Sequence, residues 1–314
     1  MRAISLALAS ASVISLFGAE ARADEPPPPP PVPEHRITFD NLLVGRINPL
    51  GLEDQYNLAY KYRLYESSSA ALRENYVAVA LSPTFSPGIT RMGGSVEIRP
   101  ATVLTLSAGF YQMIFPGAFS LGQSFQNADD DYSDTELKRR DKEGTPDEDN
   151  YTTGGWQAHL RAVALGKLGP IVIRDDLQVY VGEFRLREGD QLYYDQRTDL
   201  LVPNGGVQLT NDTDVLYMTD FGLIAGIRTS IAHAFVPDDM LGPSGENPMP
   251  TVRLGPAASY TFFDEPGASF NKPALLVLTQ WWLKHPWRTG QDVSQAMPMI
   301  ILGFRCEGEL WRSR

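Results

Sequence analysis

The sequence contains a single cysteine, Cys306, so no disulfide can form within the chain. Beyond its first residues it also lacks an apolar run long enough for a transmembrane helix, which needs roughly 20 consecutive, mostly apolar residues. Asp, Arg, Gly or Pro interrupts every later run. A chain of 314 residues without either feature needs another source of stability, which a large sheet core or a membrane can supply.

Basic residues are in the minority, with 27 Lys and Arg against 38 Asp and Glu and a formal net charge of −11. A nucleic-acid partner requires the opposite sign, because binding neutralises phosphates. Mean hydropathy is −0.21, although hydrophobic residues make up 43% of the chain and aromatic residues 10%. These values exclude a helical membrane protein, whereas they suit a sheet in which alternate residues face lipid.

The N-terminus has the order of a secretory signal peptide. Arg2 supplies the positive charge, an uncharged apolar stretch follows over residues 4–17, and Ala21-Arg22-Ala23 is a small-x-small cleavage pattern. We expect a signal peptide over residues 1–23. Residues 24–36 are a proline-rich periplasmic linker in polyproline II conformation, and residues 37–314 form the folded domain.

A period of two dominates the folded domain. In residues 55–65 the even positions are apolar or aromatic, while the odd positions include Asn57, Lys61 and Arg63. Such alternation predicts a strand with one apolar and one polar face. The strand-like segments are residues 37–46, 55–65, 74–84, 89–99, 101–113, 155–165, 170–186, 214–229, 251–262, 273–284 and 296–310.

The length of these segments favours a membrane barrel. They are about 10 to 16 residues long, whereas strands of soluble proteins have a mode near 5 to 6 and a tilted membrane strand needs roughly 9 to 11. The predicted fold is all-β: a single antiparallel, up-and-down transmembrane β-barrel. Eleven segments are found, and single-chain bacterial barrels have even strand counts. We therefore expect about 12 strands, the missing one near residues 231–250 or 115–127, with 10 as the alternative.

The connections are asymmetric. Residues 98–102 and 166–170 are tight turns, while residues 114–154 form a long loop. After residue 186 comes a protruding segment, with a hairpin turn predicted at Pro203-Asn-Gly-Gly206. No segment predicts a long amphipathic helix. Short periplasmic turns and long extracellular loops are typical of outer-membrane barrels.

The stretch from Val96 to Tyr111, two strands joined at Pro100, resembles the strand–turn–strand unit of Gram-negative outer-membrane β-barrel proteins. The resemblance covers most of residues 37–311 and is to porin-like barrels in general. It implies outer-membrane localisation, contact with outer-membrane lipid and lipopolysaccharide, and insertion by the envelope assembly machinery. Such barrels often end on an aromatic residue, whereas here Trp311 lies three residues from the end, off the parity of Phe304.

The polar faces of the strands supply a candidate pore lining. If they point inward, the lumen is lined by Lys61, Arg63, Arg91, Glu97, Arg99, His159, Arg161, Asp220, Arg228 and Arg253. A charged ring in a water-filled pore selects ions of opposite sign, so this interior would favour anionic solutes. The alternative is an Arg–carboxylate network that fills a narrow barrel and conducts nothing, because about 12 strands are fewer than the 16–18 of open porins.

Two other features have mainly structural interpretations. Trp and Tyr gather at membrane–water interfaces, where we expect Trp156, Trp281, Trp282 and Trp287. The acidic loop, residues 129–149, fails the EF-hand pattern, because its sixth position is Asp134 and its twelfth is Arg140. We expect a solvated surface loop with no metal, and no cofactor elsewhere in the chain.

No catalytic motif stands out. The His-x-Ser spacing of some barrel hydrolases is absent, and Ser230 and His233 lack an evident orienting acid. His159 could serve a dyad but is more often a hydrogen-bonded lumen residue. The sequence therefore predicts a non-enzymatic outer-membrane protein, either a narrow pore for small solutes or a structural surface protein. The alternatives are an outer-membrane hydrolase acting on lipid or peptide and a soluble exported β-protein that binds a ligand. The oligomeric state is left open.

Overall fold

The computed structural model describes residues 32–120, 122–289 and 296–313. The expected signal peptide and most of the expected linker lie outside this part of the chain. Within it, no helix is both long and apolar enough to cross a membrane.

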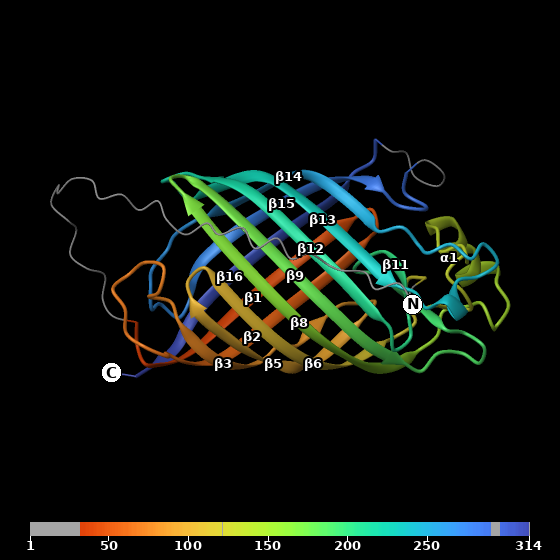
Figure 1. The fold of residues 1–314 in the computed structure, drawn as a ribbon, viewed down its shortest axis with the longest axis horizontal. Coiled ribbons are helices and arrows are strands. Elements are labelled where there is room, and N and C mark those ends of the chain that lie inside the picture. The colour runs from red at the N-terminus through yellow and green to blue at the C-terminus, as the bar shows by residue number, and fades with distance from the viewer. Residues whose placement is uncertain (1–31, 121, 290–295, 314) are drawn as a thin grey trace, which may run out of the picture. The chain divides into compact units, whose positions relative to one another are not determined.

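The described chain forms one antiparallel sheet that closes on itself, because β1 pairs with both β16 and β2 (Figure 1). Its strands are β1 (His35–Ile47), β2 (Gly51–Tyr62), β3 (Tyr76–Leu81), β4 (Thr84–Phe85), β5 (Thr90–Ala101), β6 (Leu104–Phe115), β8 (Thr153–Leu168), β9 (Ile171–Phe184), β12 (Val207–Met218), β13 (Leu223–Phe235), β14 (Thr251–Thr261), β15 (Asn271–Lys284) and β16 (Met299–Arg312). β3 and β4 run end to end between β2 and β5, so the barrel has 12 strands around its wall, as the sequence predicts.

The twelfth strand is not where we expected it. Residues 214–229 are not one segment but parts of β12 and β13, joined by a turn over residues 219–222. The hydroxyl of Thr219 accepts from Leu223 N at 3.1 Å, and Gly222 has a φ of +91°, which favours glycine. This turn keeps the odd-numbered residues on the outer face of both strands. The sequence of the two strands therefore has the same alternation as one long strand.

The outer face of the barrel is apolar and exposed. Leu58 is 43% exposed, Leu160 62%, Ile173 51% and Leu302 57%, and their polar neighbours in sequence face inward. Tyr56, the first member of the predicted stripe in β2, is also exposed rather than covered by protein. A soluble protein would bury such a surface, so the wall has the exterior of a membrane barrel.

The two ends of the barrel differ. One end, here called the turn end, holds both strand termini His35 and Arg312 and the connections over residues 63–75, 102–103, 169–170, 219–222 and 262–270. The other, the loop end, holds residues 48–50, 86–89, 116–120, 122–152, 185–206, 236–250, 285–289 and 296–298. The asymmetry is the predicted one, although residues 48–50 are a tight turn at the loop end.

A β-bulge in β16 explains the parity of Trp311. Thr38 of β1 pairs with Glu309 and Ile37 with Trp311, so Leu310 is the extra residue. A bulge shifts the alternation by one position. Trp311 is therefore 50% exposed on the same outer face as Phe304, and its apparent mismatch in the sequence disappears.

The loop end contains structure that the sequence did not predict. Helix α1 (Asp134–Glu143) lies in the acidic loop, capped by the Ser133 side chain, which accepts from Glu136 N. β7 (Ser124–Phe125), β10 (Leu192–Asp195) and β11 (Leu200–Pro203) form a second, three-stranded sheet. A short 3-10 turn, η1 (Asp238–Met240), follows β13.

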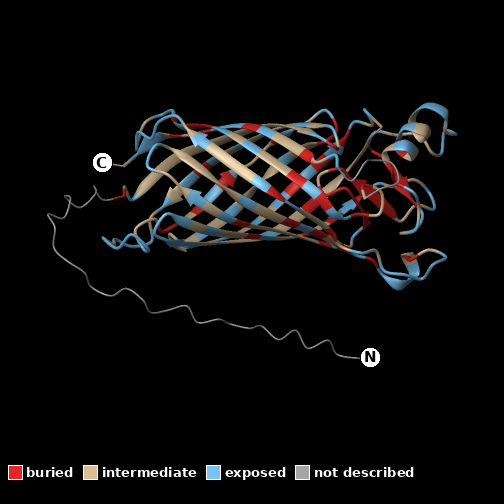
Figure 2. Cartoon of the chain, turned by 90° about the horizontal axis from the view of Figure 1, so that it is seen from above, coloured by how far each residue is buried: buried red, intermediate tan, exposed pale blue. Residues whose placement is uncertain are grey.

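β10 and β11 make a hairpin that fills the mouth of the barrel instead of protruding. All eight residues of the two strands are buried, and buried residues gather at this end (Figure 2). The hairpin turns at residues 196–199, not at the predicted residues 203–206. Its Tyr193 ring lies 4.5 Å from that of Phe184 and 6.5 Å from that of Phe115, both on the inner wall. We call residues 192–203 the plug hairpin.

Candidate functional site

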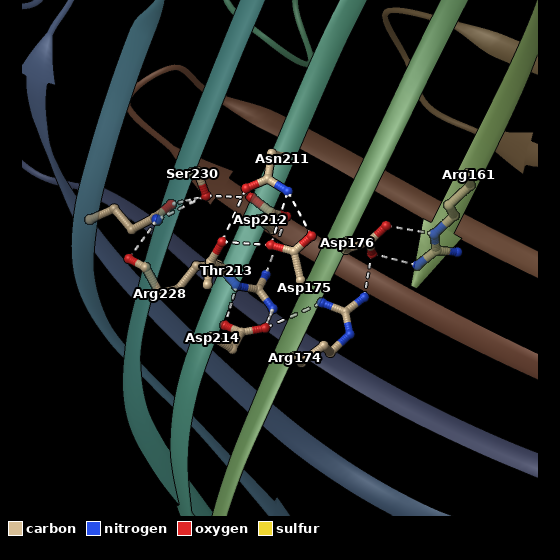
Figure 3. Close-up of polar contacts among 11 residues, drawn as sticks. Arg161, Arg174, Asp175, Asp176, Asn211, Asp212, Thr213, Asp214, Arg228 and Ser230 are labelled. Carbon is tan, nitrogen blue, oxygen red and sulfur yellow. Dashed lines mark hydrogen bonds and ion pairs between the residues drawn. The ribbon is translucent and has the colours of Figure 1, made fainter. Parts of the chain in front are cut away.

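A charged ladder crosses the inner wall of four adjacent strands (Figure 3). Arg161 of β8 binds both oxygens of Asp176 of β9, at 2.8 and 2.7 Å, and Arg174 also contacts Asp176. Asp214 of β12 lies 3.2 Å from Arg174 and 2.7 Å from Arg228 of β13. Both aspartates are at most 3% exposed, and each arginine of the ladder contacts at least one of them.

Beside the ladder the lumen contains a cavity of about 520 Å³. Its walls come from most of the barrel strands, and the tip of the plug hairpin, residues 196–198, closes it toward the loop end. Five arginines and four acidic residues line it: Arg46, Arg91, Arg161, Arg197 and Arg253 against Asp40, Glu53, Glu97 and Asp212. The cavity is thus polar and large enough for a small solute.

Three of these arginines have no carboxylate partner among the described residues. Arg46 donates to the carbonyl oxygens of Gln196 and Arg197 in the hairpin tip, at 2.6 and 3.2 Å. Arg91 donates to the Thr84 hydroxyl at 3.0 Å, and its guanidinium lies 4.8 Å from the centre of the Tyr111 ring.

Arg253 completes the set, with its guanidinium 4.9 Å from the Trp282 ring. No ion pair of the described residues includes Arg46, Arg91 or Arg253. All three stand near the loop-end termini of their strands, so the uncompensated positive charge lies directly beneath the hairpin.

The hairpin tip is itself tied to the wall by polar contacts. The Arg197 guanidinium lies 5.0 Å from the centre of the Tyr180 ring and 3.3 Å from the Gln157 side-chain oxygen. Gln208 of β12 donates to Asp195 at 3.1 Å. The tip is therefore held inside the lumen from both sides of its turn.

A buried ion cluster, the Asp199 cluster, locks the hairpin to the neighbouring loops. It consists of Asp199, His285, Arg288 and Asp134. His285 Nε2 lies 3.2 Å from Asp199 Oδ2, and Arg288 contacts the same carboxylate. Arg288 also binds both oxygens of Asp134, at the start of α1, at 2.8 Å. Asp199, His285 and Arg288 are at most 3% exposed.

The Asp199 cluster has a defined protonation pattern. Burial by itself would raise the pKa of Asp199, but the hydrogen bond from His285 and the charge of Arg288 outweigh it, so the pKa of this carboxyl is well below its usual range. The backbone N–H groups of Trp287 and Arg288 donate to His285 Nδ1, at 3.0 and 3.1 Å. This leaves the imidazole proton on Nε2, directed at Asp199.

The cluster predicts how the plug responds to pH. A carboxyl with a lowered pKa in the folded protein stabilises it fully above its unfolded value, near about 3.9, and loses this contribution as pH falls below that value. We therefore expect single-channel conductance to be flat between pH 8 and 5 and to rise only below about pH 4. Planar-bilayer recordings at stepped pH test this, and a conductance step near pH 6 would contradict it.

The predicted lumen residues do not all lie in one place. Arg91, Glu97, His159, Arg161 and Arg253 line the cavity. Lys61 and Arg99 approach the Tyr76 ring further toward the turn end, and Arg228 belongs to the ladder. Arg63 follows β2 and donates to Glu66 at 2.7 Å.

Asp220 does not line the lumen; it is exposed in the turn between β12 and β13. The acids that do neutralise the wall, Asp176 and Asp214, were missed. The three consecutive charges Arg174-Asp175-Asp176 obscure the parity of β9. Asp214 stands in a strand whose start we did not recognise.

Of the four tryptophans predicted at the membrane interface, two face outward and two do not. Trp281 is 39% exposed on the outer face, and Trp156 stacks on the outward Phe110 at 5.8 Å. Trp282 is 5% exposed and points inward, with its ring 4.6 Å from that of His285, so it is not an interface residue. Trp287 packs against Tyr132 in the loops, because the chain has left the wall at Lys284.

The hydrolase alternative gains no support from the histidines. His159 lies between the Tyr111 and Tyr180 rings, at 5.3 and 5.8 Å, and no imidazole of the described residues hydrogen-bonds a serine hydroxyl. Among the described residues there is also no cluster of His, Cys, Asp or Glu suited to a metal ion.

The acidic loop is ordered by its own ion pairs and hydrogen bonds. Arg139 binds Glu136 and Glu148 at 2.6 and 2.9 Å, and the hydrogen bond from Arg139 lowers the pKa of Glu148 to about 2. Asp129 accepts from Ser244 of another loop. The carboxylates are thus partly used in fixing α1 and its surroundings.

A closed antiparallel wall, apolar outside and polar inside, with long loops at one end, defines an outer-membrane-type β-barrel. No protein-family model matches the sequence, and no curated protein matches it.

A comparison with solved structures matches the chain at low identity to outer-membrane barrels of several kinds. The beta domain of the Bordetella autotransporter BrkA is 12% identical, covering 89% of this chain and 100% of its own, with a TM-score of 0.41. The KdgM porin in complex with disordered oligogalacturonate is 8% identical, covering 86% and 98%, with a TM-score of 0.38. OprD from Pseudomonas aeruginosa is 9% identical, covering 89% and 94%, with a TM-score of 0.30. Function therefore has to be argued from this chain's own residues.

Proposed function

We propose that this protein is a non-enzymatic outer-membrane pore that passes small solutes, with anions favoured. The turn end faces the periplasm and the loop end the exterior. The observation that carries the proposal is the polar cavity in the lumen, with Arg46, Arg91 and Arg253 unpaired beneath the plug hairpin. A purely structural barrel would need no such uncompensated charge.

The preference for anions follows from the position of these charges. The ladder holds three arginines and two aspartates, and Asp212, 3.7 Å from Arg228, supplies the third carboxylate, so the group contributes little net field along the lumen. The unpaired arginines line the cavity together with the hairpin tip, to which Arg46 donates. An anion crossing this point replaces the missing carboxylates.

The setting is that of other exported barrels. The apolar exterior lies in outer-membrane lipid and contacts lipopolysaccharide, and the envelope assembly machinery inserts the chain after the signal peptide over residues 1–23 is cleaved. Residues 24–36 are a periplasmic linker. No cofactor or nucleic acid takes part.

Ion selectivity tests the proposal. The Arg91→Gln/Arg253→Gln variant removes two of the three unpaired cations, and we expect the chloride-over-potassium permeability ratio in a salt gradient to fall at least threefold. The matched control, Arg91→Lys/Arg253→Lys, keeps the charges and should keep most of the selectivity. A wild-type protein that forms no channels, or an unchanged ratio in the glutamine variant, would refute the proposal.

A further inference from the structure

Three hydrogen-bonded polar side chains lie on the outer face of the wall. Asn211 Nδ2 is 3.1 Å from both carboxylate oxygens of Asp175, and the Thr213 hydroxyl donates to Asp175 at 2.9 Å (Figure 3). β9 and β12 pair here without a register shift. Because Arg174 and Asp176 reach the inner ladder, the intervening Asp175 faces outward.

This cluster stands among lipid-facing side chains. On the same face of β9, Ile171 and Ile173 follow toward the turn end, 44% and 51% exposed, and Leu177 follows toward the loop end, 37% exposed. Val215, next to Thr213 on the outer face of β12, is 52% exposed. An ionisable residue in such a band is costly against hydrocarbon, so a second protein surface that covers it is stabilising.

The chain itself supplies no cation to Asp175, since no ion pair of the described residues includes it. Between the outward Leu160 and Leu168, the neighbouring strand β8 presents three small residues on this face, Ala162, Ala164 and Gly166, with Ala164 directly opposite Asp175. On the other side, Thr229 of β13 pairs with Thr213. Small residues let a second wall approach closely, and hydroxyls and amides provide hydrogen bonds across the contact.

We propose that this face is the contact surface between two copies of the chain in the membrane. We call it the Asp175 patch: Ala162, Ala164, Gly166, Asp175, Asn211, Thr213 and Thr229. Two copies inserted in the same direction are related by a two-fold axis along the membrane normal, so the same patch must match itself. The Asp175 patch meets this condition when the axis lies at Thr213, because Asp175 and Thr229 flank Thr213 and the Thr229 hydroxyl of each copy then donates to the Asp175 carboxylate of the other.

The opposite side of the barrel offers a comparison. There Asn41 of β1 donates to Asp54 of β2 at 2.7 Å, also on the outer face. Its outward neighbours are bulky, with Leu43 42% and Leu52 52% exposed. Although Cys306 of β16 lies opposite Asn41, Asp54 itself lies between the bulky Leu43 and Phe85, so this pair is the matched control for the Asp175 patch.

Disulfide cross-linking in membranes tests the contact. In a Cys306→Ser background, Ala164→Cys places a thiol in the Asp175 patch and Leu43→Cys places one beside the control pair. We expect mild oxidation of outer membranes to convert most of the Ala164→Cys chains to dimers and to leave Leu43→Cys monomeric. Monomers at both positions, or equal dimers at both, would overturn the proposal, the former pointing to a different partner and the latter to random collisions.

Substitution gives an independent measurement. Asp175→Leu and Asn211→Leu suit a lipid-facing position, so the barrel should still fold, as a heat-dependent shift in mobility on a detergent gel will show. We expect the dimer dissociation constant in proteoliposomes to rise at least tenfold, while Asp54→Leu leaves it unchanged. A folded Asp175→Leu variant that dimerises like the wild type would refute the contact.

Discussion

Replacing the plug hairpin, residues 192–203, by a short Gly-Ser linker is expected to raise single-channel conductance several-fold. The hairpin occupies the mouth with buried side chains, and its tip closes the cavity from above. Because conductance depends on the narrowest cross-section, its removal should have the largest effect of any change to the loops. Conductance in planar bilayers is the measurement, at matched salt and voltage.

The control for this deletion is a replacement of the same kind outside the mouth. Residues 245–248 lie at the same end and are mostly exposed, so their replacement by the linker should leave conductance unchanged. Equal conductance of the hairpin deletion and the wild type would mean that solutes already pass beside the hairpin. In that case the hairpin would not be the barrier.

The Asp214→Ala substitution is expected to lower the free energy of unfolding by about 3–5 kcal/mol. Asp214 is 1% exposed and is shared by Arg174 and Arg228, so its loss leaves two guanidinium groups facing each other in the wall (Figure 3). Breaking a buried pair from one side costs more than the pair contributes, because the remaining charge stays desolvated. Urea titration of the detergent-solubilised barrel, followed by gel mobility, measures the change.

Asp212→Ala is the matched control, on the same strand and the same face. Its carboxylate is 34% exposed and lies 3.7 Å from Arg228, so we expect a loss of at most about 1 kcal/mol. The triple variant Asp214→Ala/Arg174→Met/Arg228→Met removes the stranded charges and should recover most of the stability. Equal losses for the two single variants would show that the ladder does not depend on the buried carboxylate.

The ladder and the plug hairpin have different roles in the lumen. The ladder lies within four wall strands and stays in place when the loops change. The hairpin depends on the Asp199 cluster, which joins it to the start of α1 and to the chain after β15. We therefore expect substitutions in the ladder to change stability and substitutions in the Asp199 cluster to change conductance.

Most of the wall could be predicted from local sequence, because alternating apolar and polar residues identify each lipid-facing strand. The stripe beginning at Tyr56 and the tight turn near Pro100 are examples, and both are present in the structure. The alternation gave a wrong prediction at two places, a turn that it did not reveal and a bulge that shifted it. The turn at Thr219–Gly222 preserves parity, so two strands looked like one segment, and the bulge at Leu310 reversed the apparent side of Trp311.

The candidate site was predicted only in part. Arg91 and Arg253 follow from parity alone, because their strands alternate cleanly. Parity does not show which arginines are paired with a carboxylate. Arg161 and Arg91 look alike in the sequence, but only Arg161 has an aspartate opposite it on the neighbouring strand. Trp282 was misplaced because an inward aromatic residue near a strand end has the same local pattern as an interface residue.

By itself the sequence determined a closed antiparallel wall with an apolar exterior, since a period of two and strand length are local properties that lipid and the backbone ladder enforce. Only the tertiary structure decided that the segment after residue 186 turns back into the mouth. The apolar residues of the plug hairpin could equally have packed in a protruding loop. Their burial against Phe115 and Phe184, and the pairing of Asp199 with Arg288, join positions far apart in the chain, and no local pattern encodes such contacts.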